Sequence, residues 1–220
     1  LAVITVLAGG VGAARLPRGL LPVPPAEDVT AVVNTADDVE LHGLHVSPDL
    51  DTVTYTLAEA IDPGRGWGLV DESWGAVEGL RRYASAAGRD DVGWFSLGDR
   101  DLATHLFRTT RLAEGATLSQ VTAEITAAWG LGLSVLPVTD DRVQTRVTSP
   151  ELGELSFQEY FVRHQHAVAV SELRFDGAPA AVPAPGVLDA IAAAEVVVVA
   201  PSNPLVSIGP VLAVPGIRDA

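Results

Sequence analysis

The sequence contains no cysteine and no lysine. Without cysteine the chain has no thiol nucleophile, no thiolate zinc site and no disulfide, which is compatible with the cytoplasm. Without lysine it has no P-loop lysine, no Schiff-base chemistry and no Ser–Lys dyad. The 14 basic residues are therefore all arginines, and against 28 acidic residues they give a net charge of −14 at pH 7.

This acidic balance bears on the partners of the protein. A chain with a net charge of −14 is expected to repel nucleic acid and anionic membranes. If it binds a phosphorylated ligand, backbone N–H groups, a few arginines or a metal must overcome the global field. The charge therefore favours small-molecule substrates, with no nucleic acid and no membrane as partners.

Aromatic residues and long apolar runs are also scarce. Aromatic side chains make up 5% of the chain and hydrophobic residues 48%, so the core is expected to consist mainly of Ala, Val and Leu. No apolar run reaches the roughly 18 residues of a membrane-spanning helix. The first residues lack the basic region of a signal peptide. These features predict a cytoplasmic location.

Short apolar runs predict the strands of a parallel sheet. The segments 1–8 (LAVITVLA), 29–33 (VTAVV) and 195–200 (EVVVVA) are rich in β-branched residues and indicate strands buried on both faces. Two further strands are predicted over 134–138 and 142–148. A glycine-rich turn and a short helix separate the first two strands, so the chain opens with a βαβ unit.

Helical periodicity and end signals predict the remaining elements. Thr117 and Gln120 match a capping box, and Ser47 and Pro48 are expected to cap and start another helix. The proline-rich stretch 21–25 is expected to end the first helix. Helices are predicted over 13–21, 49–60, 71–87, 99–111, 117–129 and 187–194, and from 207 onward.

These elements together predict an α/β fold. We expect a Rossmann-like, mostly parallel sheet with helices on both faces, plus a smaller insertion of helices and strands. One domain is predicted over residues 1–220, with a mostly helical inserted region over approximately 62–185. Another helix is expected to begin near residue 216, so we expect a C-terminal portion to be missing.

Two turns that follow apolar strands are candidates for ligand binding. The first, Gly9-Gly10-Val11-Gly12, lets the backbone approach an anion at the start of a helix. The second contains Ser202, Asn203 and Pro204 and offers hydrogen-bonding groups between two prolines. Each turn is also compatible, though less so, with an ordinary strand-to-helix connection that binds nothing.

The turn after the second strand is acidic. Asp37 and Asp38 follow Asn34, and Asp49 and Asp51 come within the next loop. Four carboxylates this close in sequence are costly unless water or a cation neutralises them, and oxygen ligands suit Mg²⁺ or Ca²⁺ rather than zinc. The alternative is a solvated loop in which aspartates cap helices.

Four arginines are possible phosphate clamps because their guanidinium groups can bind anions bidentately. They are Arg15, Arg100, Arg108 and Arg142. The acids near Arg100 and Arg142 also fit ion pairs and helix caps.

Six segments together resemble one known family, the 2-phospho-L-lactate transferases of coenzyme F420 biosynthesis (CofD, called FbiA in actinobacteria). Any one segment alone would be a weak signal, but the six run through nearly the whole chain. They are LAGGVGAARLPRGL, AVVNTADDVELHGLHVSPDLDTVTYTLA, WFSLGDRDLATHLFRT, LPVTDDRVQT, FQEYFVR and VVVAPSNPLVSIGPVLAVPGIRDA. The chain departs from the family at Ala13 and Pro17, and the proline is expected to delay the first helix.

The resemblance implies a reaction and a cofactor. A guanosine diphosphate ester of lactate or enolpyruvate donates its phospho-acid group to the ribityl hydroxyl of Fo, the deazaflavin precursor. GMP leaves, and the product is F420-0 or dehydro-F420-0. The resemblance also implies Mg²⁺ and a homodimer, and the alanine- and arginine-rich composition favours the enolpyruvyl donor.

The resemblance also implies roles for particular residues. Asp37 and Asp51 correspond to metal ligands, and Asp38 and Asp49 would orient the metal or accept the hydroxyl proton. The turn Gly9, Gly10, Val11 and Gly12 and the turn Ser202, Asn203 and Pro204 would bind the donor diphosphate and guanosine. Asn34 and the stretch 49–55, including Thr52, would face Fo.

Two other functions fit part of the pattern. A non-catalytic nucleotide-sugar-binding regulator of the gluconeogenesis-factor type shares the glycine turn and an Asp-Asp loop. Here, however, that loop continues as VELHG and PDLDT, which favours the transferase. An NAD-dependent oxidoreductase fits the glycine turn loosely, but a Lys partner for a proton relay is impossible in this chain.

Overall fold

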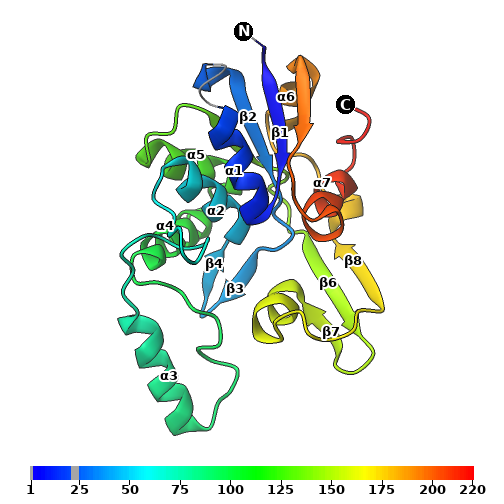
Figure 1. Cartoon of the computed structure of the whole chain (residues 1–220). Helices are drawn as coiled ribbons and strands as arrows, with labels where there is room; N and C mark the ends of the chain where they lie inside the picture. Colours follow the sequence, from blue (N-terminus) through cyan, green and yellow to red (C-terminus); the bar gives the residue numbers. More distant parts are fainter. Residues whose placement is uncertain (1, 21–24) are drawn as a thin grey trace.

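The structure, a computed structural model, describes residues 2–20 and 25–220. Its centre is a sheet of four parallel strands in the order β5–β2–β1–β9 (Figure 1). The strands are β1 (Ile4–Ala8), β2 (Val29–Val33), β5 (Ser134–Pro137) and β9 (Val196–Val199). The predicted α/β fold with a parallel sheet is confirmed, and the apolar runs form its strands.

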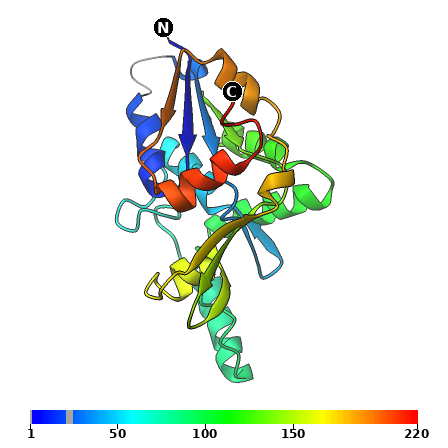
Figure 2. The same ribbon diagram turned by 90° about the vertical axis from the view of Figure 1, so that its right-hand side faces the viewer.

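Helices cover both faces of this sheet. One face packs against α1 (Gly10–Leu20), α2 (Pro48–Leu57) and α5 (Leu118–Ala128), and the other against α6 (Val187–Ala193) and α7 (Gly209–Ala213). Figure 2 shows α7, coloured red, in front of the strands. Val6 and Leu7 belong to the two opposite cores, as the alternation of side chains along a strand requires.

A second sheet lies beyond the carboxyl ends of the parallel strands (Figure 1). Its antiparallel strands, in the order β7–β6–β8, are β6 (Gln144–Ser149), β7 (Gly153–Ser156) and β8 (Glu172–Asp176). A hairpin of β3 (Val39–Leu41) and β4 (Leu44–Val46) lies in the same half of the molecule. The remaining helices and turns are η1 (Ala26–Asp28), α3 (Gly75–Ala87), α4 (Asp101–Ala113), η2 (Glu159–Arg163), η3 (Ala178–Ala180) and η4 (Pro204–Ile208).

The region predicted to be inserted, 62–185, contains α3–α5 and the second sheet, but it also supplies β5 to the main sheet. Its limits as a separate unit remain a prediction. Within the described residues, no helix combines the length and the apolar content needed to cross a bilayer.

Local signals predicted some element ends correctly. The Thr117 hydroxyl accepts the N–H of Gln120, and the Gln120 side chain accepts the N–H of Thr117, so the capping box of α5 is confirmed. The first helix begins at Gly10 rather than at Ala13, so the proline within it does not delay its start. The predicted stop over 21–25 lies, except for Pro25, outside the described residues, as does Leu1 of the first predicted strand.

Two expectations near the end of the chain are wrong. The helix predicted from 207 onward is present, because η4 runs directly into α7 and ends at Ala213. Residues 215–219, however, form turns where another helix was expected. Strand β9 is not fully buried, because it is the edge of the sheet, and Val196, Val197 and Val199 are 45%, 43% and 54% exposed. An apolar run alone does not distinguish a central strand from an edge strand.

Candidate active site

The turns that follow β1 and β9 lie against each other. The Ser202 hydroxyl donates a hydrogen bond to the Gly9 carbonyl oxygen at 2.6 Å. A Cβ atom on Gly12 would lie only 2.5 Å from the carbonyl oxygen of Pro201. The chain leaves β1 towards β2 on one side, and β9 returns on the other, so the strand order reverses between β1 and β9. In open α/β sheets ligands bind outside the carboxyl ends of strands at such a point.

Replacing Gly12 by alanine is expected to force these two turns apart. The added methyl group overlaps a backbone oxygen that cannot rotate away, and overpacking of this kind costs about 1–3 kcal/mol. Urea unfolding at equilibrium measures this cost. Gly19→Ala in the same helix is the matched control, because a Cβ there meets nothing within 4 Å. Equal stability of the two variants would contradict the close approach of the turns.

Three of the four predicted carboxylates gather at this edge of the sheet. Asn34, directly after β2, donates from Nδ2 to Oδ2 of Asp49 at 2.9 Å. Asp37 and Asp49 are buried, with 5% and 7% exposed. Among the described residues, Oδ1 of Asp37 and Oδ1 of Asp38 are buried without a hydrogen-bond partner. Buried carboxylate oxygens without partners are the donor set that a hard divalent cation prefers.

The electrostatics of these carboxyls agree with that interpretation. Burial raises the pKa of Asp37 well above its usual value, and the charge of Asp49 raises it further. Burial also raises the pKa of Asp38. The pKa of Asp49 rises to about 6 through burial and the charge of Asp38, although hydrogen bonds from Asn34 and the Gly10 backbone oppose the rise. The cluster therefore favours protons or a cation over free negative charge.

A specific pH dependence of stability follows for the cation-free protein. The pKa of Asp49 is about 6 in the folded state against an ordinary value of 3.8, so the folded state binds more protons between these values. Its stabilising contribution is complete below about pH 4 and is lost as the pH rises through about 6, a loss of about 3 kcal/mol. Urea unfolding in EDTA at pH 4 to 8 measures it. Asp49→Asn should lack this loss, and identical pH profiles would contradict the prediction.

Asp51 does not join this cluster, although it lies on α2 near Asp49. Its Oδ1 pairs with Nη2 of Arg108, and its Oδ2 accepts from Nη1 at 3.2 Å. Ligand atoms of Asp51, Asp101 and His105 lie within 4.8 Å of one another, so this second group could also hold a metal. The assignment of Asp51 as a metal ligand together with Asp37 remains a prediction.

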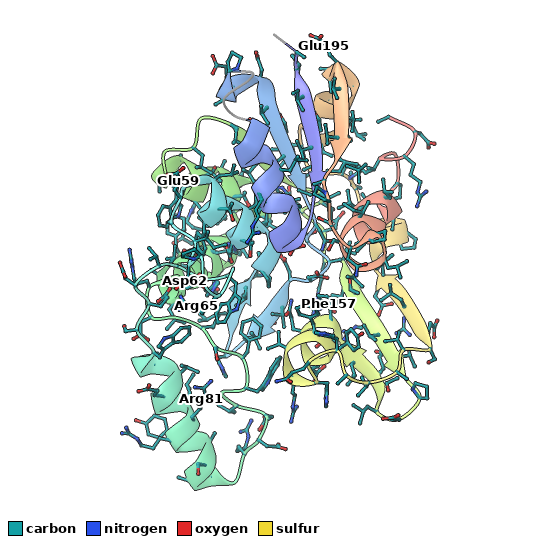
Figure 3. All side chains as sticks on the ribbon, viewed as in Figure 1. Glu59, Asp62, Arg65, Arg81, Phe157 and Glu195 are labelled. Carbon is teal, nitrogen blue, oxygen red and sulfur yellow. The ribbon has the colours of Figure 1, made fainter. Side chains whose placement is uncertain are left out.

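The arginines predicted as phosphate clamps have different surroundings. Arg108 is 1% exposed and is committed to Asp51, so its predicted role as a phosphate clamp is wrong. Arg100 donates from Nη1 to the Val70 carbonyl. Arg15 is exposed and lines a cavity of about 490 Å³ together with Asp62. Asp62 pairs with Arg65 in the loop that follows α2 (Figure 3).

Several predicted residues use their polar atoms inside the protein. Asn203 caps η4 by accepting the N–H groups of the next turn, where Pro204 is the first residue.

Ser47 does not cap α2, because its hydroxyl donates to Asp38 at 2.7 Å. Thr52 is buried on α2, and the Tyr55 hydroxyl donates to Asp101 at 2.6 Å. The side chain of Val11 lies outside the described part of the chain.

Sequence reasoning did not predict the contacts of three residues that surround the acidic cluster. His45 Nε2 lies 2.9 Å from Oδ2 of Asp38, and Gln158 Nε2 donates to the backbone oxygen of Asp37 at 3.1 Å. Thr145 and Gln158 line a cavity of about 20 Å³ beside Asp37 and Asp38, together with Phe157, which directly follows β7 (Figure 3). Only the FQEYFVR segment of the resemblance pointed towards Gln158, and no spacing rule connects it to residue 37.

Three comparisons with known proteins bear on this site. A sequence model of the family described as 2-phospho-L-lactate transferase CofD matches residues 4–220. A phosphoenolpyruvate transferase of Streptomyces griseus subsp. griseus is 50% identical over 220 residues, covering 99% of this chain and 68% of the relative. One of Kitasatospora aureofaciens is 50% identical over 223 residues, covering 99% and 67%. One of Mycobacterium sp. (strain JLS) is 48% identical over 235 residues, covering 99% and 70%.

Solved structures add support for the fold alone. Two structures of a Bacillus halodurans protein, one of them titled a member of the UPF0052 family, each superpose with a TM-score of 0.65 at 20% and 19% identity. They cover 99% and 100% of this chain, whereas this chain spans 64% and 65% of theirs. The chain thus spans about two thirds of the length of the proteins it resembles. The family match extends over nearly every described residue, and the chain therefore belongs to the 2-phospho-L-lactate transferase (CofD) family.

Proposed function

We propose that the protein transfers a phosphoenolpyruvyl or phospholactyl group from a guanosine diphosphate ester to the ribityl hydroxyl of Fo. The hydroxyl oxygen bonds to the phosphorus that carries the acid, the bond from that phosphorus to the GMP oxygen breaks, and the hydroxyl proton passes to a base. GMP leaves, and F420-0 or dehydro-F420-0 forms. The family match carries this proposal, and the phosphoenolpyruvate transferases about 50% identical to the chain favour the enolpyruvyl donor.

The glycine turn is the proposed site of the donor diphosphate. Backbone N–H groups at the start of α1 attract anions. Asp49 already approaches this end of the helix, since its Oδ1 lies 3.7 Å from where a Cβ of Gly10 would stand. A phosphate and the Asp49 carboxylate therefore repel each other there unless a proton or a cation reduces the charge.

Asp37 and Asp38 fit a divalent cation and would hold it. Their buried Oδ1 atoms lack partners among the described residues, and a cavity large enough for about one water or ion lies beside them. Mg²⁺, when bound, would supply charge neutralisation to the donor phosphates, which a protein without lysine needs. Asp51, the other predicted ligand, is occupied by Arg108, so we propose Asp37 and Asp38 as the pair.

Asp49 is the proposed base for the ribityl hydroxyl. Its pKa of about 6 lies close to neutral pH, where a general base works well. The Asn34 amide holds one carboxylate oxygen of Asp49, and the Gly10 backbone also donates to this carboxylate at the glycine turn. Asp38 is the less suitable base because His45 and Ser47 both engage its Oδ2.

The direct test mixes the protein with Fo, Mg²⁺ and each of the two guanosine donors. GMP release that depends on Fo, together with the product mass, would establish the transferase and name the donor. Omission of Fo and addition of EDTA are the controls. If the protein shows neither turnover nor Fo binding, the proposal is overturned, and a nucleotide-sugar-binding regulator becomes the favoured function. The homodimer and the cytoplasmic location belong to the same proposal, and light scattering on the purified protein tests the first.

A further inference from the structure

A buried ion pair joins helix α4 to the first turn of α2. Arg108 of α4 contacts both carboxylate oxygens of Asp51, and both side chains are almost completely excluded from solvent. Nη1 of Arg108 also lies 3.4 Å from Nδ1 of His105. A bidentate pair between a guanidinium and a carboxylate fixes the relative orientation of the two side chains as well as neutralising their charges. The pair therefore holds α2, and with it Asp49, at a fixed place against α4.

The same helix holds the backbone of His45 from two sides. The N–H of His45 donates to the Thr109 hydroxyl oxygen at 2.8 Å, and its carbonyl oxygen accepts from Arg108 Nη1 at 3.4 Å. The Thr109 hydroxyl in turn donates to the carbonyl of His105 within α4. Two neighbouring residues of α4 thus determine where the backbone of β4 runs.

His45 transmits this placement to the acidic cluster. Its Nε2 lies 2.9 Å from Oδ2 of Asp38, and Ser47, two residues later, donates to the same oxygen at 2.7 Å. These contacts occupy Oδ2 and leave Oδ1 of Asp38 buried and without a partner among the described residues. The contacts on Oδ2 therefore fix the orientation of the carboxylate and with it the position of the free Oδ1.

We propose that Arg108 and Thr109 are positioning residues that hold the His45–Asp51 segment so that Asp38 presents its free oxygen to a cation. The proposal rests on the proposed function for its role in turnover, but it makes a separate claim about cation binding. Neither residue touches the proposed reacting atoms. Outer partners that orient a metal ligand typically change metal affinity about 10- to 100-fold when they are replaced.

The first test measures Mn²⁺ binding alone, by calorimetry on the purified full chain. Arg108→Lys keeps a positive charge beside Asp51, so the variant is expected to fold. It loses the bidentate contact with the carboxylate, so it is expected to bind Mn²⁺ about 10- to 100-fold more weakly. Thr109→Val removes the acceptor for His45 without touching Asp51, and it provides the same test if the lysine variant does not fold. Arg111→Met is the control, since Arg111 pairs with Glu114 and Glu124 on the outer side of α4.

A second background separates positioning from a general effect on folding. His45→Ala removes the imidazole contact with Asp38 and leaves only the Ser47 contact, so adding Arg108→Lys should weaken Mn²⁺ binding less than it does in the unmodified protein. If Arg108→Lys weakens binding equally in both backgrounds, Arg108 does not act through His45 and the proposal fails. It also fails if Arg108→Lys and Thr109→Val are both folded, as cooperative unfolding in urea would show, and both bind Mn²⁺ as tightly as the unmodified protein.

Turnover distinguishes this proposal from the proposed function. If the protein releases GMP in an Fo-dependent way, Arg108→Lys should lower kcat by a similar factor and change the KM for Fo little. If the protein shows no such turnover while the Mn²⁺ pattern holds, the proposed reaction is wrong and the positioning role stands. A rise in KM for Fo with unchanged kcat and Mn²⁺ affinity would place Arg108 in acceptor binding and overturn the inference.

Discussion

Replacing Asp37 by asparagine is expected to lower Fo-dependent GMP release by roughly 10³-fold, the scale of a lost cation that stabilises several kcal/mol of transition-state charge. The same change is expected to stabilise the cation-free protein at pH 7. Burial and the charge of Asp49 raise the pKa of Asp37, and asparagine removes that unfavourable charge while keeping the shape. Because the charged carboxylate is unfavourable where it is buried, the free energy of unfolding at pH 7 should rise in the variant.

Steady-state turnover and urea unfolding in EDTA measure these two effects. The gain in stability should shrink as the pH falls, because the raised pKa of Asp37 lets its carboxylate take up a proton in the unmodified protein. Asp140→Asn is the matched control, because Asp140 accepts from the backbone N–H and hydroxyl of Ser119 at the start of α5, and it should keep full turnover while gaining no stability. Unchanged turnover of the Asp37 variant would exclude it from the cation site. A loss of stability at pH 7 would mean that its charge is already compensated.

The features that could be predicted from the sequence are those that local pattern determines. β-branched runs formed β1 and β2, and the glycine turn between strand and helix fixed the start of the βαβ unit. The acidic turn was placed correctly as well, since the carboxyl ends of neighbouring parallel strands share one edge of the sheet. Chain order alone therefore brought Gly9 and Asn34 to one place.

The features that could not be predicted depend on contacts between distant segments. Arg108 and Asp51 are 57 positions apart, and whether an aspartate faces a cation site or an arginine is decided by the packing of α4 on α2. Gln158 reaches Asp37 across 121 positions from the segment between β7 and η2, and no periodicity in the sequence predicts that this segment packs against Asp37. Likewise, the four valines of β9 are compatible with a central strand until the strand order is known.

Asp49→Asn tests the proposed base. If Asp49 accepts the ribityl proton, asparagine should lower kcat by about 10²- to 10⁴-fold, because it cannot accept the proton. Fo binding, followed by fluorescence, should remain nearly intact, since the Asn34 amide can still donate to the side-chain oxygen of the introduced amide. In the unmodified protein kcat/KM should fall as the pH drops through about 6, where the Asp49 carboxylate becomes protonated.

Asp38→Asn provides the comparison that separates a base from a cation ligand. It should weaken Mn²⁺ binding, because Oδ1 of Asp38 is the oxygen that lacks a partner among the described residues. It should nevertheless keep the acidic limb of the pH profile, that is, the fall in kcat/KM as the pH drops through about 6. Asp49→Asn should lose that limb. If the limb persists in the Asp49 variant and disappears in the Asp38 variant, the two roles are exchanged. If it persists in both, the proton passes to water, and the raised pKa of Asp49 reflects only its burial beside the glycine turn.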